Sequence, residues 1–120
     1  MAAGKLNLVI EQGATFKKTI TVQDKNGVAI NLANSDIVGV AKQRLNSSTE
    51  LFEFEIIERI DNLGKFSIYL PDEATTLLNF TTGVYDIQIR FLDGTVMRLL
   101  EGNIVLNKGV TLWVLHLMYM

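Results

Sequence analysis

The chain has 120 residues, and its 11 Lys and Arg against 13 Asp and Glu give a net charge of −2. This length fits one domain, and a hydrophobic share of 48% is typical of a globular core rather than of a disordered chain. The chain has no Cys, which excludes disulfides, thiolate metal sites and Cys nucleophiles. Lys17–Lys18 is the only adjacent basic pair. We therefore expect no nucleic-acid partner, because binding to phosphates takes clustered basic residues.

The N-terminal residues lack a basic start followed by a long apolar stretch, which argues against a signal peptide. No apolar run approaches the roughly 20 residues that a membrane-spanning helix needs, so we expect no membrane contact. The sequence shows no linker, low-complexity tract or internal repeat. We therefore predict one domain over residues 1–111, followed by an apolar C-terminal segment over residues 112–120.

Alternation of apolar and polar residues predicts extended structure through the first third of the chain. A first strand is expected over residues 6–10 and a Thr-rich strand over residues 16–22. The sequence Asp24-Lys25-Asn26-Gly27 predicts a tight turn, because Asn-Gly readily adopts the positive φ that such turns require. Residues 28–32 then resume an extended run, and a further strand is expected over residues 37–42.

The clearest alternation lies at residues 51–60, where Phe52, Phe54 and Ile56 share one face while Glu53 and Glu55 occupy the other. A turn over residues 61–64 leads into a strand over residues 65–70, so these two strands are expected to form a hairpin. The segment 71–78 is the one predicted helix, because Pro suits a first helical position and acidic residues suit the N-terminal end of the helix dipole. At about two turns, this helix is expected to serve as a crossover between sheets.

The last two predicted strands cover residues 85–91 and 96–106, joined by an Asp-Gly turn at Asp93-Gly94. Gly102 lies inside the second of them and is expected to mark a bulge or a bend. The whole chain therefore contains about seven to nine short strands with regular turn signals, which is typical of a sandwich or small barrel. We predict an all-β, mostly antiparallel β-sandwich, because inward and outward faces are clear and no ligand-cavity pattern is visible.

Catalytic patterns are missing from the sequence. The only His, His116, sits in an apolar segment without an orienting partner or a nucleophile, and one imidazole without thiolates makes a poor zinc site. Glu53, Glu55 and Glu58 alternate with apolar residues, which is typical of the solvated face of a half-buried strand. The loop oxygens of Asp24 and Asp93, among others, do not follow the spacing of a calcium loop. We expect no enzyme activity, no metal and no cofactor.

The C-terminal segment 112–120 is apolar almost throughout and holds the only Trp and the only His. Three hypotheses account for it: a last strand over the core of its own domain, a strand that pairs with another subunit, or a segment not native to the domain. The second hypothesis makes this segment a protein interface. Its candidate interface residues are Leu112, Trp113, Val114, Leu115, Leu117 and Tyr119.

The order of several segments resembles a known family. These segments are residues 11–16, the Asp24 to Leu32 stretch, residues 64–68, Gly83-Val84-Tyr85-Asp86-Ile87, Asp93-Gly94-Thr95-Val96-Met97-Arg98, and Val110-Thr111. Over residues 6–111 the chain is similar to small structural domains of tailed bacteriophages and prophages, including the N-terminal domains of baseplate upper proteins. The resemblance implies an Ig-like β-sandwich that acts in tail or baseplate assembly within the virion and has no catalytic residues. The sequence after Thr111 departs from that pattern.

We therefore expect a virion structural module that works through protein–protein contacts, either as a homo-oligomer or with other tail components. The alternative is a ligand-binding sandwich, above all for carbohydrate, that uses the loops at one end. Exposed aromatic side chains would form its platform, and the candidates are Tyr69, Trp113 and Tyr119.

Overall fold

The computed structural model describes residues 3–113, and the regular structure in this part of the chain is mostly strand. The strands are β1 (Gly4–Lys5), β2 (Leu8–Glu11), β3 (Phe16–Thr21), β4 (Asp36–Lys42), β5 (Glu50–Ile60), β6 (Lys65–Leu70), β7 (Thr82–Arg90) and β8 (Val96–Asn107). A 3-10 turn, η1 (Asp61–Leu63), and a five-residue helix, α1 (Asp72–Thr76), are its helical elements. The predicted all-β class is confirmed.

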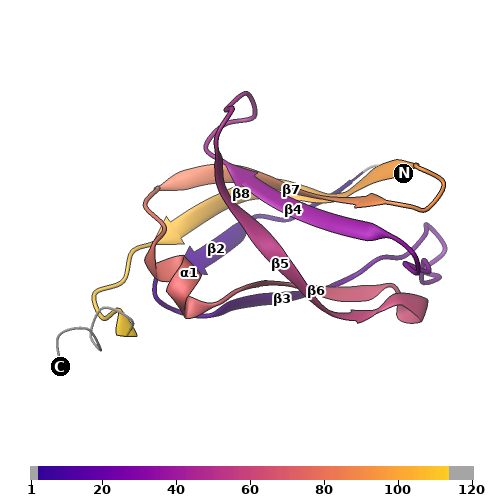
Figure 1. The fold of residues 1–120 in the computed structure, drawn as a ribbon, viewed down its shortest axis with the longest axis horizontal. Coiled ribbons are helices and arrows are strands. Elements are labelled where there is room, and N and C mark those ends of the chain that lie inside the picture. The colour runs from indigo at the N-terminus through magenta and orange to yellow at the C-terminus, as the bar shows by residue number, and fades with distance from the viewer. Residues whose placement is uncertain (1–2, 114–120) are drawn as a thin grey trace.

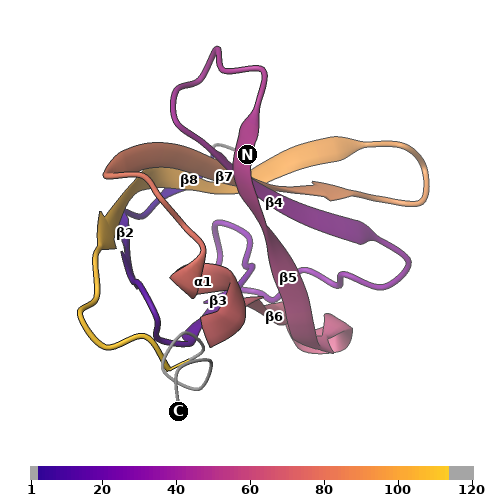
Figure 2. The same cartoon turned by 60° about the vertical axis from the view of Figure 1, so that its left-hand side comes forward.

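The strands form one sheet in the order β1-β8-β7-β4-β5-β6-β3, with β2 also paired to β8. All pairs are antiparallel except those of β1 and β2 with β8, which are parallel. β5 pairs with β4 along its first half and with β6 along its second half. It therefore passes from one layer to the other, and the sheet curls over on itself (Figures 1 and 2).

The core fills the space between the two halves of the curl. Its fully buried side chains come from both halves, and they include Phe66 and Ile68 of β6 and Ile87, Ile89 and Ile104 of β7 and β8. An aromatic group joins the halves, since the ring of Phe54 on β5 contacts those of Phe16, Phe52 and Tyr85. Burial of these side chains is the main driving force for the curl.

The predicted hairpin of residues 51–70 is confirmed as β5, η1 and β6. Gly64 ends η1 with φ of 65°, and a Cβ there would press on the backbone of Val22 and Ile30. The predicted helix is also present but shorter than expected. Pro71 precedes its first residue as the N-cap and does not occupy the first helical position.

Further local expectations differ from the structure, and the first of them is the strand over residues 6–10, which is broken at residues 6–7 between β1 and β2. Residues 28–32 form no strand of their own, since their only ladder contact is an isolated bridge between Gln23 and Ala29. The reason is that Ile30 and Leu32 donate their backbone N–H groups to Val22 and Asp61, which turns the segment into a loop packed under the sheet.

Gly102 does not mark a bulge. The register shift in the β7–β8 pair falls at Leu99, which is the extra residue between Arg98 and Leu100. Gly102 lies where the chain between β1 and β2 approaches β8, and a Cβ at this position would clash with the carbonyl oxygen of Leu6. The glycine is required by close backbone approach rather than by a bulge.

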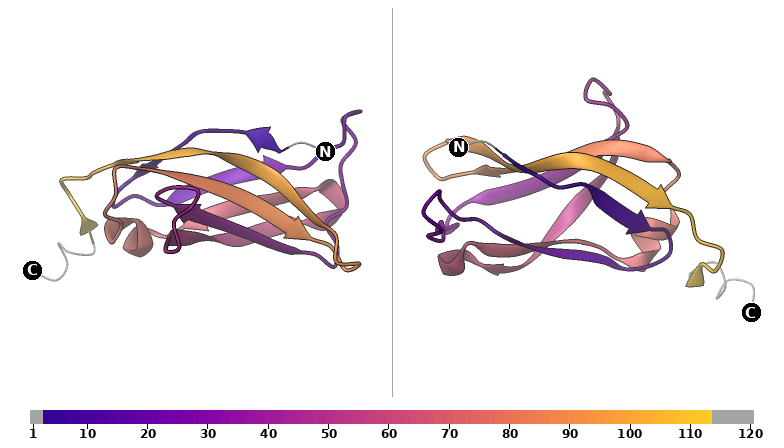
Figure 3. Two further views of the ribbon diagram at one scale, coloured as in Figure 1. Left: turned by 90° about the horizontal axis from the view of Figure 1, so that it is seen from above. Right: turned by 180° about the vertical axis from the view of Figure 1, so that it is seen from behind.

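The last strand, β8, ends at Asn107, and the chain then crosses the end of the molecule that holds α1 (Figure 3, left). Within residues 3–113, no helix is long and apolar enough to cross a membrane.

Candidate functional site

The acidic residues of β5 do not converge on a site. Glu53 and Glu55 are exposed on the outer side of the strand, and Glu58 pairs with Lys17 at 2.6 Å between Oε1 and Nζ. No group of three or more metal-ligating side chains occurs among residues 3–113. His116 lies outside the described residues.

The acidic turn residues hold their own turns. Asp24 Oδ1 accepts hydrogen bonds from the backbone N–H groups of Asn26 and Val28 at 2.8 and 3.0 Å. Asp93 Oδ1 likewise accepts from the N–H of Thr95 at 2.8 Å, and this bond lowers the pKa of the Asp93 carboxyl. Side-chain hydrogen bonds of this kind are the ordinary role of Asp in tight turns.

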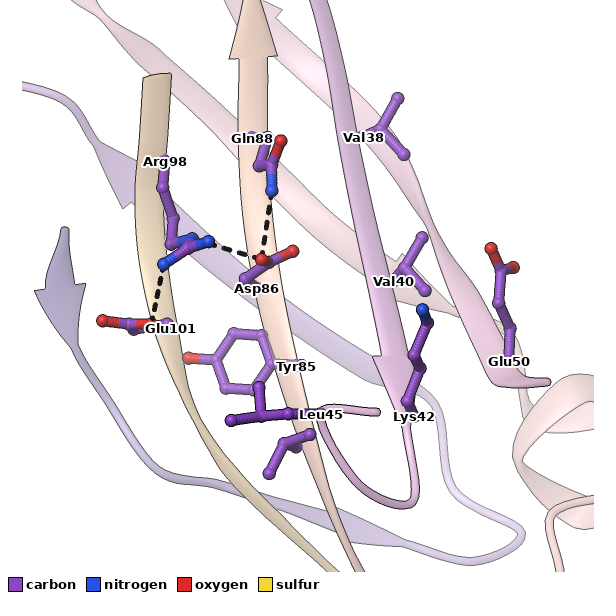
Figure 4. Close-up of a pocket in the computed structure, with 11 residues that line it drawn as sticks. Val38, Val40, Lys42, Leu45, Glu50, Tyr85, Asp86, Gln88, Arg98 and Glu101 are labelled. Atoms are coloured by element: carbon purple, nitrogen blue, oxygen red, sulfur yellow. Dashed lines mark hydrogen bonds and ion pairs between the residues drawn. The ribbon is translucent and has the colours of Figure 1, made fainter. Parts of the chain in front are cut away.

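A hollow of about 360 Å³ lies on the outer face of β4, β7 and β8, beside the loop that joins β4 to β5 (Figure 4). The alternation of β4 and β7 explains its composition. Inward-facing residues such as Ile37 of β4 and Ile87 of β7 are buried. The residues that alternate with them along each strand face outward and line the hollow, together with the buried Tyr85. The lining consists of Val38, Val40, Lys42, Leu45, Glu50, Val84, Tyr85, Asp86, Gln88, Arg98 and Glu101.

A chain of charged side chains closes one side of the hollow. Arg98 Nε lies 3.3 Å from Asp86 Oδ2, and its Nη1 lies 3.5 Å from Glu101 Oε2. Lys5 of β1 joins the chain at 2.9 Å from Glu101 Oε1, and its hydrogen bond lowers the pKa of the Glu101 carboxyl. Gln88 donates to Asp86 Oδ2 at 3.1 Å. These groups satisfy one another, so they position neighbouring strands rather than present a reactive charge.

The other side of the hollow is aliphatic. Val38, Val40 and Val84 project from neighbouring strands, and Leu45 is 88% exposed on the adjoining loop. The lining contains no His, Cys, Ser or Thr that could act as a nucleophile or general base. The alternation pattern does not reveal this hollow, because residues 37–41 are apolar on both faces of the strand.

A second candidate region is the end of the molecule around α1, which we call the α1 end and define by Leu77, Val110, Leu112 and Trp113. A polar network fixes it: Gln12 Nε2 donates to the carbonyls of Thr76 and Leu78 at 3.2 and 3.1 Å. The same side chain accepts from the N–H of Gly109 at 3.0 Å. The β2–β3 turn, α1 and the segment after β8 are therefore held together.

Around this network, apolar side chains face solvent. Leu77 is 78% exposed, Trp113 is 61% exposed and Val110 is fully exposed. Leu112 is half-buried and packs on Gly13, where a Cβ would collide with its side chain. Of the predicted interface residues, the structure thus places Leu112 and Trp113 at this end. Val114, Leu115, Leu117 and Tyr119 lie outside the described residues.

Tyr69, the remaining candidate for a carbohydrate platform, is half-buried on the outer side of β6. It is in register with Lys17 of β3 and Glu55 of β5. This placement matches an ordinary cross-strand contact.

The chain matches no protein-family model, and no curated protein matches its sequence. The proposals below therefore rest on the sequence and on the geometry of the described residues.

Proposed function

We propose that this protein is a non-catalytic assembly module that acts through protein–protein contacts at the α1 end. The observation that carries the proposal is the exposure of Leu77, Val110 and Trp113 on segments that the hydrogen bonds of Gln12 hold together at this end. Large apolar side chains grouped on a surface are typical of interaction sites, whereas single ones are ordinary. Trp is also among the residues that contribute most to binding energy at interfaces.

Within the all-β class, we propose that the fold is an Ig-like sandwich. Its support is the strand order: β3, β6 and the second half of β5 match the B, E and D strands, while β4, β7 and β8 match C, F and G. The parallel pairing of the N-terminal strands with β8 places them beside the G strand. In this chain one strand, β5, joins the two sheets.

We further propose that the partner is a component of a phage or prophage tail or baseplate, either a second copy of this chain or a neighbouring tail protein. The support is the resemblance carried by the ordered turn segments, above all Gly83-Val84-Tyr85-Asp86 and Asp93-Gly94-Thr95-Val96. The first segment lies on β7, and the second forms the β7–β8 turn and the start of β8. These two strands are the longest pair of neighbours in their layer.

The proposal is tested by light scattering after size exclusion, on the full chain and on a form that ends at Thr111. We expect the full chain to form a defined oligomer and the shortened form to be a monomer. A second variant, Leu77→Ser in the full chain, is expected to weaken the oligomer, and Leu92→Ser, at an equally exposed Leu of the β7–β8 turn, is the matched control. If all four forms are monomers of equal stability, self-assembly through the α1 end is wrong.

A further inference from the structure

The curled sheet has two edges. One is formed by β1 and β2, which are short and are interrupted at residues 6–7. The other is β3, whose only strand partner among the described residues is β6. β3 runs without a break for six residues, so on its outer side the N–H and C=O groups of alternate residues have no strand partner within residues 3–113. Figure 3 (right) shows β3 diverging from β2 beyond the turn that joins them.

The side chains on the core side of β3 are unusual. Phe16 and Ile20 are half-buried and pack against the core. Lys18 lies between them on the same face, directly opposite Ile68, which is fully buried. Lys18 is nevertheless exposed, and its ammonium has no ion-pair partner among residues 3–113. A Lys on the core face of a strand reaches solvent only where the layer is open beside it. The core side of the β3 edge is therefore accessible.

Lys18 also determines which strand can pair with this edge. In an antiparallel pair of two β3 strands, the register that sets Phe16 against Ile20 places the two Lys18 side chains directly opposite each other. Like charges at directly opposed positions destabilise a strand pair. Lys17 does not add to this charge, because Glu58 neutralises it at 2.6 Å. In this register, which also matches the apolar residues, the edge disfavours self-pairing through one charge on its core face.

We propose that β3 is a docking edge for an extended segment of a partner protein with an apolar–acidic–apolar pattern at alternate positions. Main-chain hydrogen bonds would add the segment to β3, its two apolar side chains would contact Phe16 and Ile20, and its carboxylate would meet Lys18. The unpaired charge that rejects a second β3 strand selects the acidic partner strand. This proposal rests on the assembly function proposed above and names the chemistry of one partner.

The test is an NMR titration of the full chain with a capped heptapeptide, Thr-Ile-Thr-Glu-Thr-Ile-Thr, and with the same peptide carrying Lys in place of Glu. We expect the acidic peptide to shift the backbone amides of Phe16–Thr21 and to bind roughly tenfold more tightly than the basic one. In Lys18→Glu the preference is expected to reverse. Lys25→Glu is the matched control, because Lys25 lies in the turn after β3, and it is expected to leave the preference unchanged.

The proposal is overturned if neither peptide binds, if both bind equally, or if the shifted amides lie elsewhere, for example around the β4–β7–β8 hollow. These outcomes are separable from failure of the assembly function. If an oligomer depends on residues 112–120 and neither peptide binds, the docking role of the β3 edge is wrong and the proposed assembly function is retained. If the chain binds the acidic peptide but stays monomeric, the docking role of the β3 edge is supported and self-assembly through the α1 end is wrong.

Discussion

The break between β1 and β2 is organised around a single carbonyl group. Leu6 O accepts a hydrogen bond from the Tyr85 hydroxyl at 2.6 Å, and the same oxygen lies against Gly102. Asn7 Oδ1 accepts from the backbone N–H of Asn103 at 3.0 Å, which replaces the ladder bond that the break removes. The N-terminal edge can therefore change direction while these backbone groups keep hydrogen-bond partners.

Gly102→Ala is expected to lower the free energy of unfolding by about 2–3 kcal/mol. The added methyl group would clash with the carbonyl of Leu6, which is backbone and has little room to move. Gly4→Ala is the control, because its Cβ would meet the flexible end of Leu100 at 3.3 Å and the carbonyl oxygen of Leu99 at 3.6 Å, which is ordinary van der Waals contact. Urea unfolding of both variants measures the difference, and equal stability of the two would contradict this account of Gly102.

Tyr85→Phe is expected to destabilise the fold by about 1–2 kcal/mol near neutral pH, because Leu6 O loses its donor. Burial raises the pKa of Tyr85 from 10.0 to about 12. Between these values the unfolded chain has released the proton and the folded chain still holds it, so the stability of the native protein falls as pH rises. The difference in free energy of unfolding between the native protein and the variant should have its full size below pH 10 and should shrink toward pH 12. Unfolding curves collected across this range check it, with Tyr69→Phe as control; a constant difference would exclude this role.

At the scale of elements, Arg59 anchors the loop between β3 and β4. Its guanidinium donates to the carbonyls of Leu32 and Ser35 at 2.8 and 2.9 Å and pairs with Asp61 Oδ1 at 2.9 Å. Leu32, at the centre of this loop, is fully buried. The loop is thereby fixed to the end of β5 and to η1 although it forms no strand there.

Arg59→Ala is expected to cost about 2–4 kcal/mol, because several charge-assisted hydrogen bonds are lost together. Arg59→Lys should recover little of this, since a single ammonium cannot reach the two carbonyls and the carboxylate in the same fork geometry. Chemical unfolding gives the energies, and faster hydrogen exchange at residues 30–35 should accompany the loss. Arg90→Ala, at an exposed position on β7, should change stability by less than about 0.5 kcal/mol.

The sequence predicted the elements best where one face of a strand is buried. Alternation located β3, β5, β6, β7 and β8, because a buried face forces period two on the residues. It failed for residues 28–32, where Ile30 and Leu32 alternate like a strand but satisfy their N–H groups outside any ladder. It also misjudged Gly102, since close approach by residues distant in sequence leaves no local pattern.

For the candidate sites, the sequence drew attention to residues 112–120, and the structure describes only the first two of them. The β4–β7–β8 hollow and the open β3 edge were not predicted. Both depend on which strands become neighbours, and that is decided by the curl of the sheet. Lys18 illustrates the point, because it looks like an ordinary polar residue of an alternating strand until Ile68 is placed opposite it.

At the scale of the whole molecule, the curl gives the protein surfaces of different character. The β1–β2 edge is short and interrupted, the β3 edge carries one unpaired charge, and the α1 end is apolar. A short, interrupted edge such as β1–β2 resists unwanted strand pairing. The β3 edge and the α1 end are instead suited to partners of complementary charge or apolar surface. The assembly function that we propose needs this division, because each contact must form with one neighbour and not with every copy in solution.

The parallel pairing of the N-terminal strands with β8 has a mechanical consequence. β1 and β2 contribute two and four residue pairs to this ladder, and because the paired strands run in the same direction, the start of β1 and the end of β8 lie at opposite ends of it. Tension applied between the two ends therefore pulls β2 and β8 along their length in opposite directions. The load falls on all these hydrogen bonds at once, in shear, instead of opening them one by one.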